Sequence, residues 1–142
     1  MAGYFRIFPE HNLVYVRYSG SASIADYVAV IDGYTSHPDY DPHRKNLVDL
    51  RFLENFERDY TAALALQARI AEYALTAHAD ILSIMVAPSP VAMEAAKLIT
   101  RSWEGIDTPV VRRIVPTMDE AATLLGIDIK TLDGLLEQVS EA

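Results

Sequence analysis

The segment from residue 37 to residue 43 gathers the side chains of this chain that most resemble metal ligands. His37, Asp39, Asp41 and His43 supply two imidazoles and two carboxylates, and such nitrogen and oxygen donors bind divalent metals. Their spacing matches no recognised metal-ligand motif, and Pro-Asp and Asp-Pro pairs also build turns with solvated His side chains. We prefer the turn, and we expect neither a metal site here nor a cofactor elsewhere in the chain.

A second group of candidates follows the predicted parallel strands. Arg51, Ser89 and Thr117 each come after such a strand, and Ser89 and Thr117 head predicted helices. Ligands gather at the carboxyl ends of parallel strands, and the free N–H groups of helix N-termini favour anions. These three residues are therefore the predicted ligand-binding site. The alternatives are helix capping by Ser89 and Thr117, and an ion pair of Arg51 with Asp49 or Glu54.

The chain offers little for catalysis. His11 lies in a predicted hairpin turn and His78 follows a helix end, and neither has a Ser or Cys partner in a G-x-S-x-G-type motif. The six glycines are scattered and form no phosphate-binding loop. There is no cysteine, which excludes disulfides, thiol catalysis and thiolate metal ligands. We predict no catalytic residue.

Composition limits the class of protein and its partners. The 142 residues are 51% hydrophobic and 23% charged, which is typical of one globular domain. Twelve basic and twenty acidic residues give a net charge of −8, which disfavours nucleic acid and anionic membranes as partners. No signal peptide and no run of ~20 apolar residues is found. We expect a cytoplasmic protein with no membrane span.

Hydrophobic periodicity and turn signals predict a β-β-α-β-α-β-α-β-α-α order. The predicted strands cover residues 4–8, 13–19, 46–49, 80–87 and 110–115, and the predicted helices 23–36, 59–76, 90–103, 117–126 and about 128–141. This order implies an α/β fold: a mostly parallel mixed sheet of about five strands with an N-terminal hairpin at one edge and helices packed on it. Residues 1–142 are expected to form a single domain.

The last predicted helix is amphipathic, with a stripe formed by Ile129, Leu132, Leu135, Leu136 and Val139. The stripe has two interpretations: packing against the protein's own sheet, or a homodimer contact to which Trp103 would contribute.

Three segments resemble a known family. His37–Pro42 leads into Asn46–Arg51 (HPDYDP and NLVDLR), Ile81–Val86 is a buried strand, and Val115–Ala121 continues to Gly126. Together they resemble the STAS (sulfate transporter and anti-sigma-factor antagonist) domain, and more narrowly the bacterial SpoIIAA-like proteins, over about residues 4–127. The resemblance implies a SpoIIAA-like fold, with a domain core at about 4–127 followed by the C-terminal helix.

Regulatory members of that family carry a phosphorylated Ser in an Asp-Ser-Ser-Gly-like turn after the third strand. Residues 50–60 contain neither Ser nor Gly, and the nearest aliphatic hydroxyl is that of Thr61. The acidic side chains of Glu54, Glu57 and Asp59 would repel a phosphate added there. We predict no phosphorylation site and no switch of this type.

The expected function is a non-catalytic STAS-like binding or regulatory module that interacts with a protein partner or with itself as a homodimer. The first alternative is a carrier for a small anionic or apolar ligand, including a lipid; the second is an enzyme of unknown reaction. A cavity bounded by aromatic side chains would favour the carrier, whereas a flat sheet face with a packed core would favour the interaction module. The aromatic candidates are Tyr27, Tyr34, Phe52, Phe56 and Trp103.

Overall fold

A five-stranded mixed sheet forms the centre of the protein. The computed structural model describes residues 2–74, 81–102 and 110–139. The strand order is β1-β2-β4-β6-β7, with β1 antiparallel to β2 and all other neighbours parallel. This confirms the predicted mixed sheet with a hairpin at one edge. The strands are β1 (Gly3–Phe8), β2 (Leu13–Tyr18), β4 (Lys45–Asp49), β6 (Ile81–Val86) and β7 (Val110–Val115).

The hairpin turn is a short 3-10 helix, η1 (Pro9–His11), followed by Asn12 in the left-handed conformation with φ of 51°. Asn adopts this conformation at lower cost than most residues because its short polar side chain can hydrogen-bond locally. The predicted turn between the first two strands is therefore confirmed, with Asn12 as the residue that reverses the chain.

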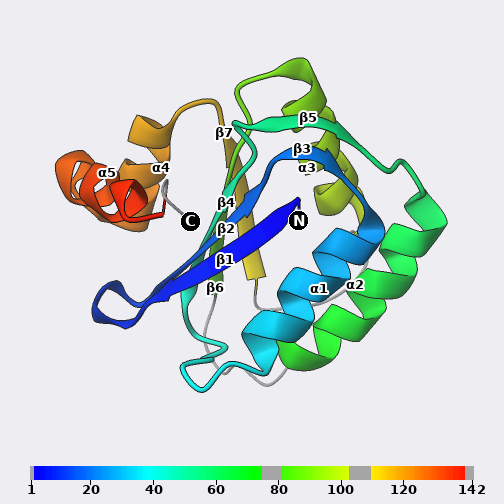
Figure 1. The fold of residues 1–142 in the computed structure, drawn as a ribbon, viewed down its shortest axis with the longest axis horizontal. Coiled ribbons are helices and arrows are strands. Elements are labelled where there is room, and N and C mark those ends of the chain that lie inside the picture. The colour runs from blue at the N-terminus through cyan, green and yellow to red at the C-terminus, as the bar shows by residue number, and fades with distance from the viewer. Residues whose placement is uncertain (1, 75–80, 103–109, 140–142) are drawn as a thin grey trace.

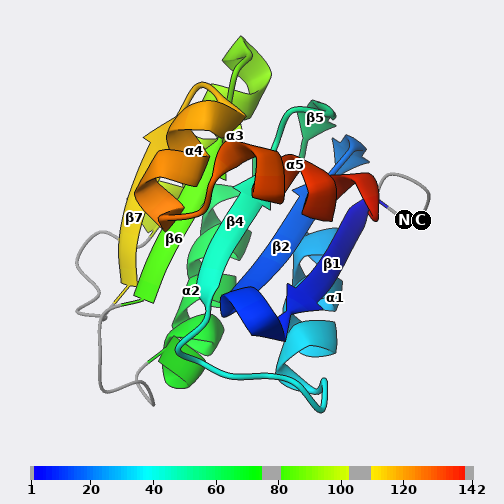
Figure 2. The same cartoon turned by 90° about the vertical axis from the view of Figure 1, so that its left-hand side faces the viewer.

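Helices cover both faces of the sheet (Figures 1 and 2). One face carries α1 (Ile24–Thr35), α2 (Tyr60–Ala74) and α3 (Pro90–Ser102), and the other carries α4 (Met118–Leu125) and α5 (Ile129–Glu137). The capping signals read from the sequence are present. Ser23 and Asp26 form a reciprocal capping box at α1, and Gly126 ends α4 with φ of 71°.

The sequence did not predict two short strands, β3 (Gly20–Ala22) and β5 (Leu53–Phe56), which pair in parallel as a separate sheet. Gly20, with φ of 65°, redirects the chain after β2, and its N–H donates to the Phe52 carbonyl at 3.0 Å. Strands of three and four residues are too short for alternation to be recognised. The sequence predicted that a helix follows the strand at residues 46–49 directly. In the structure, β5 lies between β4 and α2.

The stripe on α5 packs against the protein's own sheet. Leu132, Leu135 and Val139 are buried in one cluster with Tyr15 and Leu47 of the central strands. The structure therefore shows the first of the two interpretations, packing against the protein's own sheet, and the homodimer contact stays a prediction. Trp103 lies outside the described residues. In the described ranges, no helix has the length and apolar character needed to cross a bilayer.

Candidate ligand-binding cavity

Polar side chains form a row across the buried sheet face that α1, α2 and α3 cover. Asn46 of β4 pairs in register with Ser83 of β6, and Ser83 pairs with Arg112 of β7. On the other side of Asn46, the apolar Val14 of β2 pairs with it, so the polar row ends at Asn46. Side chains alternate between the faces of a sheet, so the residues that follow these three, such as Leu47 and Ile84, point to the opposite face. A buried sheet face is ordinarily apolar, which makes this row unusual.

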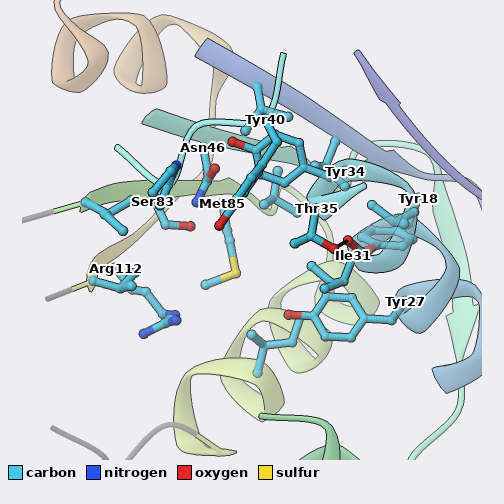
Figure 3. A pocket seen from close by; sticks show the side chains of 18 residues that line it. Tyr18, Tyr27, Ile31, Tyr34, Thr35, Tyr40, Asn46, Ser83, Met85 and Arg112 are labelled. Atoms are coloured by element: carbon cyan, nitrogen blue, oxygen red, sulfur yellow. Dashed lines mark hydrogen bonds between the residues drawn. The ribbon is translucent and has the colours of Figure 1, made fainter. Parts of the chain in front are cut away.

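The row borders a cavity of about 150 Å³ between the sheet and α1. Most of its wall is apolar, and it includes Val16, Val30, Ile31, Val48, Met85 and Ile99. Tyr27 and Tyr34 contribute from α1, and Tyr40 and Pro42 from the loop after it. In Figure 3 the Tyr27 hydroxyl and the Arg112 guanidinium approach the cavity from opposite sides of Met85. An apolar cavity with a few convergent polar groups is the usual form of a small-molecule site.

Two ionisable groups at this cavity have displaced pKa values. Burial lowers the pKa of Arg112 to about 10, and the nearby Tyr27 only partly opposes this effect. Burial raises the pKa of Tyr27, although the charge of Arg112 and a hydrogen bond from Gln67 act against it. At neutral pH Tyr27 therefore stays a neutral hydroxyl and Arg112 a cation. Both are suited to holding a ligand, whereas a proton-transfer group would need a pKa nearer to neutral pH.

The loop of residues 37–44 forms one wall of the cavity and is fixed by its own hydrogen bonds. The Tyr34 hydroxyl donates to the Asp41 carbonyl at 2.8 Å, and the Arg44 guanidinium donates to the Asp39 carbonyl at 3.1 Å. The Asp39 N–H donates to His37 Nδ1 at 3.0 Å. These turn contacts agree with the preferred interpretation of the loop.

The four side chains considered as metal donors do not converge in the structure. His43 Nδ1 lies 3.1 Å from Asp41 Oδ1, but the described ranges contain no group of three or more His, Cys, Asp or Glu side chains placed to hold a metal ion.

The aromatic residues proposed to line a pocket divide into separate locations. Tyr27 and Tyr34 line the cavity, and Tyr27 together with Phe56 lines a second, smaller one. Phe52 is 50% exposed on the surface. Trp103 lies outside the described residues.

The predicted strand-end residues all make local contacts. Ser89 Oγ accepts from the Ala92 N–H at 3.2 Å, and Thr117 Oγ1 accepts from the Glu120 N–H at 3.2 Å, so both cap helices. Arg51 pairs with Asp49, as the alternative interpretation held. The three residues follow the neighbouring strands β4, β6 and β7. A ligand on Arg51, Ser89 and Thr117 stays a prediction.

Asp49 is completely buried and accepts four hydrogen bonds. The Tyr15 hydroxyl donates to Oδ2 at 2.6 Å, and Arg51 donates from Nε, Nη2 and its backbone N–H at 2.9–3.0 Å. Burial, followed by the charge of Asp49, raises the pKa of Tyr15, while the hydrogen bonds to Asp49 raise that of Arg51. The cluster ties β2 to the turn after β4. Its polar atoms are satisfied by one another, which identifies it as structural.

Asn46, Ser83 and Arg112 were not predicted as a group from the sequence, although a signal was present. Ser83 interrupts the apolar strand ILSIMV, and Arg112 occupies an inward position of VVRRIV. Alternation within each strand could have assigned both side chains to a sheet face. The register between β4, β6 and β7 brings the three together, and the sequence does not contain that register.

The comparisons with known proteins add no relative. No family model matches this chain, and neither a curated protein nor a solved structure resembles it at a significant level. The resemblance to the STAS domain therefore stays a prediction, and the cavity is the feature of the structure that bears on function.

Proposed function

We propose that this protein is a non-catalytic binding module for a small, mostly apolar molecule held between the sheet and α1. The observation that supports this proposal is the cavity of about 150 Å³ crossed by the row Asn46, Ser83 and Arg112. A sphere the size of a water molecule needs ~10–15 Å³ measured in this way, so the space holds on the order of ten non-hydrogen atoms. That is the size of a small metabolite or a short acyl chain.

The polar row distinguishes a binding site from a packing fault. Asn, Ser and Arg lose hydration when a sheet face is buried, and apolar residues at these positions would avoid that penalty. Ser83 is 8% exposed and lies in the centre of the sheet between β4 and β7. Polar groups among apolar walls fix the orientation of a ligand, which explains why they are tolerated in this position.

Filling the cavity tests the proposal. Ser83→Leu places a larger apolar side chain at the centre of the row, and we expect it to weaken the binding of naphthalene, a fluorescent apolar dye with a ten-carbon skeleton, at least tenfold, measured by fluorescence titration. Its melting temperature should equal or exceed that of the wild type, because filling a cavity commonly stabilises a fold. Ser21→Leu is the matched control, since Ser21 is exposed on β3.

Two results would argue against the proposal: no dye binding by the wild type, or equal binding by Ser83→Leu and the wild type. Native mass spectrometry of the protein purified from its own host adds an independent test. A bound small molecule is expected in the wild type and should be absent from Ser83→Leu.

A second candidate function is the interaction module that the resemblance to the STAS domain implies. The observation that favours it is Phe52, which is half-exposed and has two arginines near its ring. The guanidinium carbons of Arg17 and Arg51 lie 5.8 and 5.2 Å from the centre of its ring. Aromatic and Arg side chains are the residues most enriched in interface hot spots.

Self-association is the measurable form of this second candidate. We expect the wild type to dimerise in light scattering, and Phe52→Asp to weaken dimerisation about tenfold or more. Leu124→Asp is the control, because Leu124 is similarly exposed, at 46%, on α4. A wild type that is monomeric at all concentrations, or equal effects of the two substitutions, would remove the dimer interpretation.

A further inference from the structure

A second cavity of about 70 Å³ adjoins the first and shares Tyr18, Tyr27 and Ile99 with it. It lies among α1, β5, α2 and α3, and Leu53, Phe56, Leu66 and Ala95 form much of its apolar wall. The two cavities therefore meet at these three side chains. A ligand in the larger cavity contacts side chains that also border the smaller one.

Two polar atoms at the smaller cavity are buried without a hydrogen-bond partner. In the described part of the chain these atoms are Tyr18 Oη and Gln67 Oε1, and both residues line this cavity. Tyr18 is 4% exposed and Gln67 1% exposed. A buried polar atom left unsatisfied destabilises a fold, and Phe and Leu at these positions would avoid the loss. Within the described residues, the folded chain therefore provides no hydrogen-bond partner for either atom.

The chemistry of the two atoms defines that partner. Burial raises the pKa of Tyr18 well above its usual value, so its hydroxyl stays protonated and offers a proton. Gln67 Oε1 can accept a hydrogen bond, and the Gln67 side chain also hydrogen-bonds the Tyr27 hydroxyl. The complementary group must accept from Tyr18 and donate to Gln67. A hydroxyl does both with one atom, and it fits a space of this size.

The surroundings favour a neutral group over a charged one. The smaller cavity is almost entirely apolar, and an anion placed there would lose its hydration without a compensating positive charge among the described lining residues. The only ionisable side chain besides the tyrosines among its described lining residues is Glu57, which would repel an anion. An ammonium group could donate to Gln67, but it has no lone pair to accept the Tyr18 proton.

The geometry points to an alcohol as the ligand class: an aliphatic chain in the larger cavity and a terminal hydroxyl between Tyr18 and Gln67 in the smaller one. This assignment rests on the proposed binding function and adds the chemical identity of the head group. It gives a role to two polar side chains that the larger cavity alone does not explain.

Four probes with the same ten-carbon chain test the head group by competitive displacement of the dye naphthalene. Decanol should bind about tenfold more tightly than decyl methyl ether, which can accept from Tyr18 but cannot donate to Gln67. Decylamine and decanoic acid, charged at neutral pH, should bind more weakly than decanol.

Two variants locate the contacts. Gln67→Leu should weaken decanol binding about tenfold and leave the ether unchanged, so that the alcohol loses its advantage. Tyr18→Phe should weaken both the alcohol and the ether. Thermal melting of each variant checks that the fold is retained, and Ser21→Leu again serves as the unaffected control.

The outcomes separate the two proposals. If the dye binds to the wild type, three results leave the binding function in place and show that the alcohol assignment is wrong. These results are that no decyl probe displaces the dye, that all four probes displace it equally, or that decanoic acid binds most tightly. The assignment is also wrong if decanol still binds more tightly than the ether in Gln67→Leu, because the hydroxyl of decanol then does not donate to Gln67. If the dye does not bind to the wild type at all, the proposed function itself fails.

Discussion

The two faces of the central sheet use the same strands and are filled in different ways. On the face covered by α4 and α5, large side chains such as Leu47 and Ile84 are completely buried in one apolar cluster, and the buried carboxylate of Asp49 has all its hydrogen bonds. On the other face, Asn46 and Ser83 replace apolar residues and border an open cavity. The first face is a packed core, whereas the second combines a buried apolar cluster that includes Val30 and Met85 with a cavity that has the properties of a binding site.

This contrast shows that burial alone does not identify the role of a polar residue. Asp49 and Ser83 are both buried in the sheet. The first is surrounded by donors from its own chain, so its contribution is structural. The second lies in a row of polar side chains beside empty space, so its contribution is open to a ligand. The distinction depends on what surrounds the polar atom.

The largest predicted effect comes from truncating matched isoleucines on β6. Ile84→Ala, on the packed face, should lower the free energy of unfolding by about 2–5 kcal/mol, because it creates a new cavity. Ile81→Ala should lower it by about half as much, because Ile81 already borders an open space and loses fewer contacts. Urea denaturation measures both. Equal losses would mean that the cavity is closed in solution, which would break the comparison.

A smaller effect is expected from removing one hydroxyl on each face. Tyr15→Phe deletes the hydrogen bond to the buried Asp49 carboxylate and should lower the free energy of unfolding by about 1.5–3 kcal/mol. Tyr18→Phe deletes a buried hydroxyl that has no partner within the described residues, and should leave stability unchanged or raise it slightly. A loss of similar size in Tyr18→Phe would show that this hydroxyl is satisfied in the absence of any ligand.

The smallest effect concerns alkaline pH. The pKa of Tyr34 is raised to about 12 by burial, and those of Tyr15, Tyr18 and Tyr27 are also raised. A raised folded-state pKa contributes stability that is complete below the unfolded pKa of ~10 and is lost as the pH rises through the folded value. Arg112, with its pKa lowered to about 10, acts in the opposite direction above pH 10 but is a single group.

We therefore expect net destabilisation between about pH 10 and pH 12, and delayed ionisation of four of the eight tyrosines. Absorbance at 295 nm, compared with the protein unfolded in guanidinium chloride, measures this ionisation. In Tyr15→Phe one delayed ionisation should disappear and the three at the cavity should remain. Ionisation of all tyrosines near pH 10 in the folded protein would contradict the burial described for both faces.

The sequence predicted the main elements of the fold because local signals define them. Ser23 with Asp26, and Gly126, identified helix ends, and the apolar run Ile81–Val86 identified a buried central strand. The paired strands β3 and β5 were missed because neither is long enough to show a period, and each is stabilised by the other across about thirty residues of chain.

The sequence placed its candidate site at strand ends, where Ser89 and Thr117 cap helices and where a ligand stays a prediction. The cavity depends on register between strands and on the distance between α1 and the sheet, and neither can be read locally. Tyr27 and Tyr34 were correctly named as pocket residues because of their type. Their partners Ser83 and Arg112 were not, because their significance appears only when three strands are aligned.

The hydrogen bond from Tyr34 to the Asp41 carbonyl has a consequence for the rate of ligand exchange. It joins α1 to a loop whose backbone is further restrained by Pro38 and Pro42. The entropy of ordering that wall is therefore lost during folding and not during association, which favours tight binding by a preorganised site. Because the wall is rigid, a ligand can leave only after local opening of α1 or the loop. We therefore expect a low dissociation rate as long as the Tyr34–Asp41 hydrogen bond is intact.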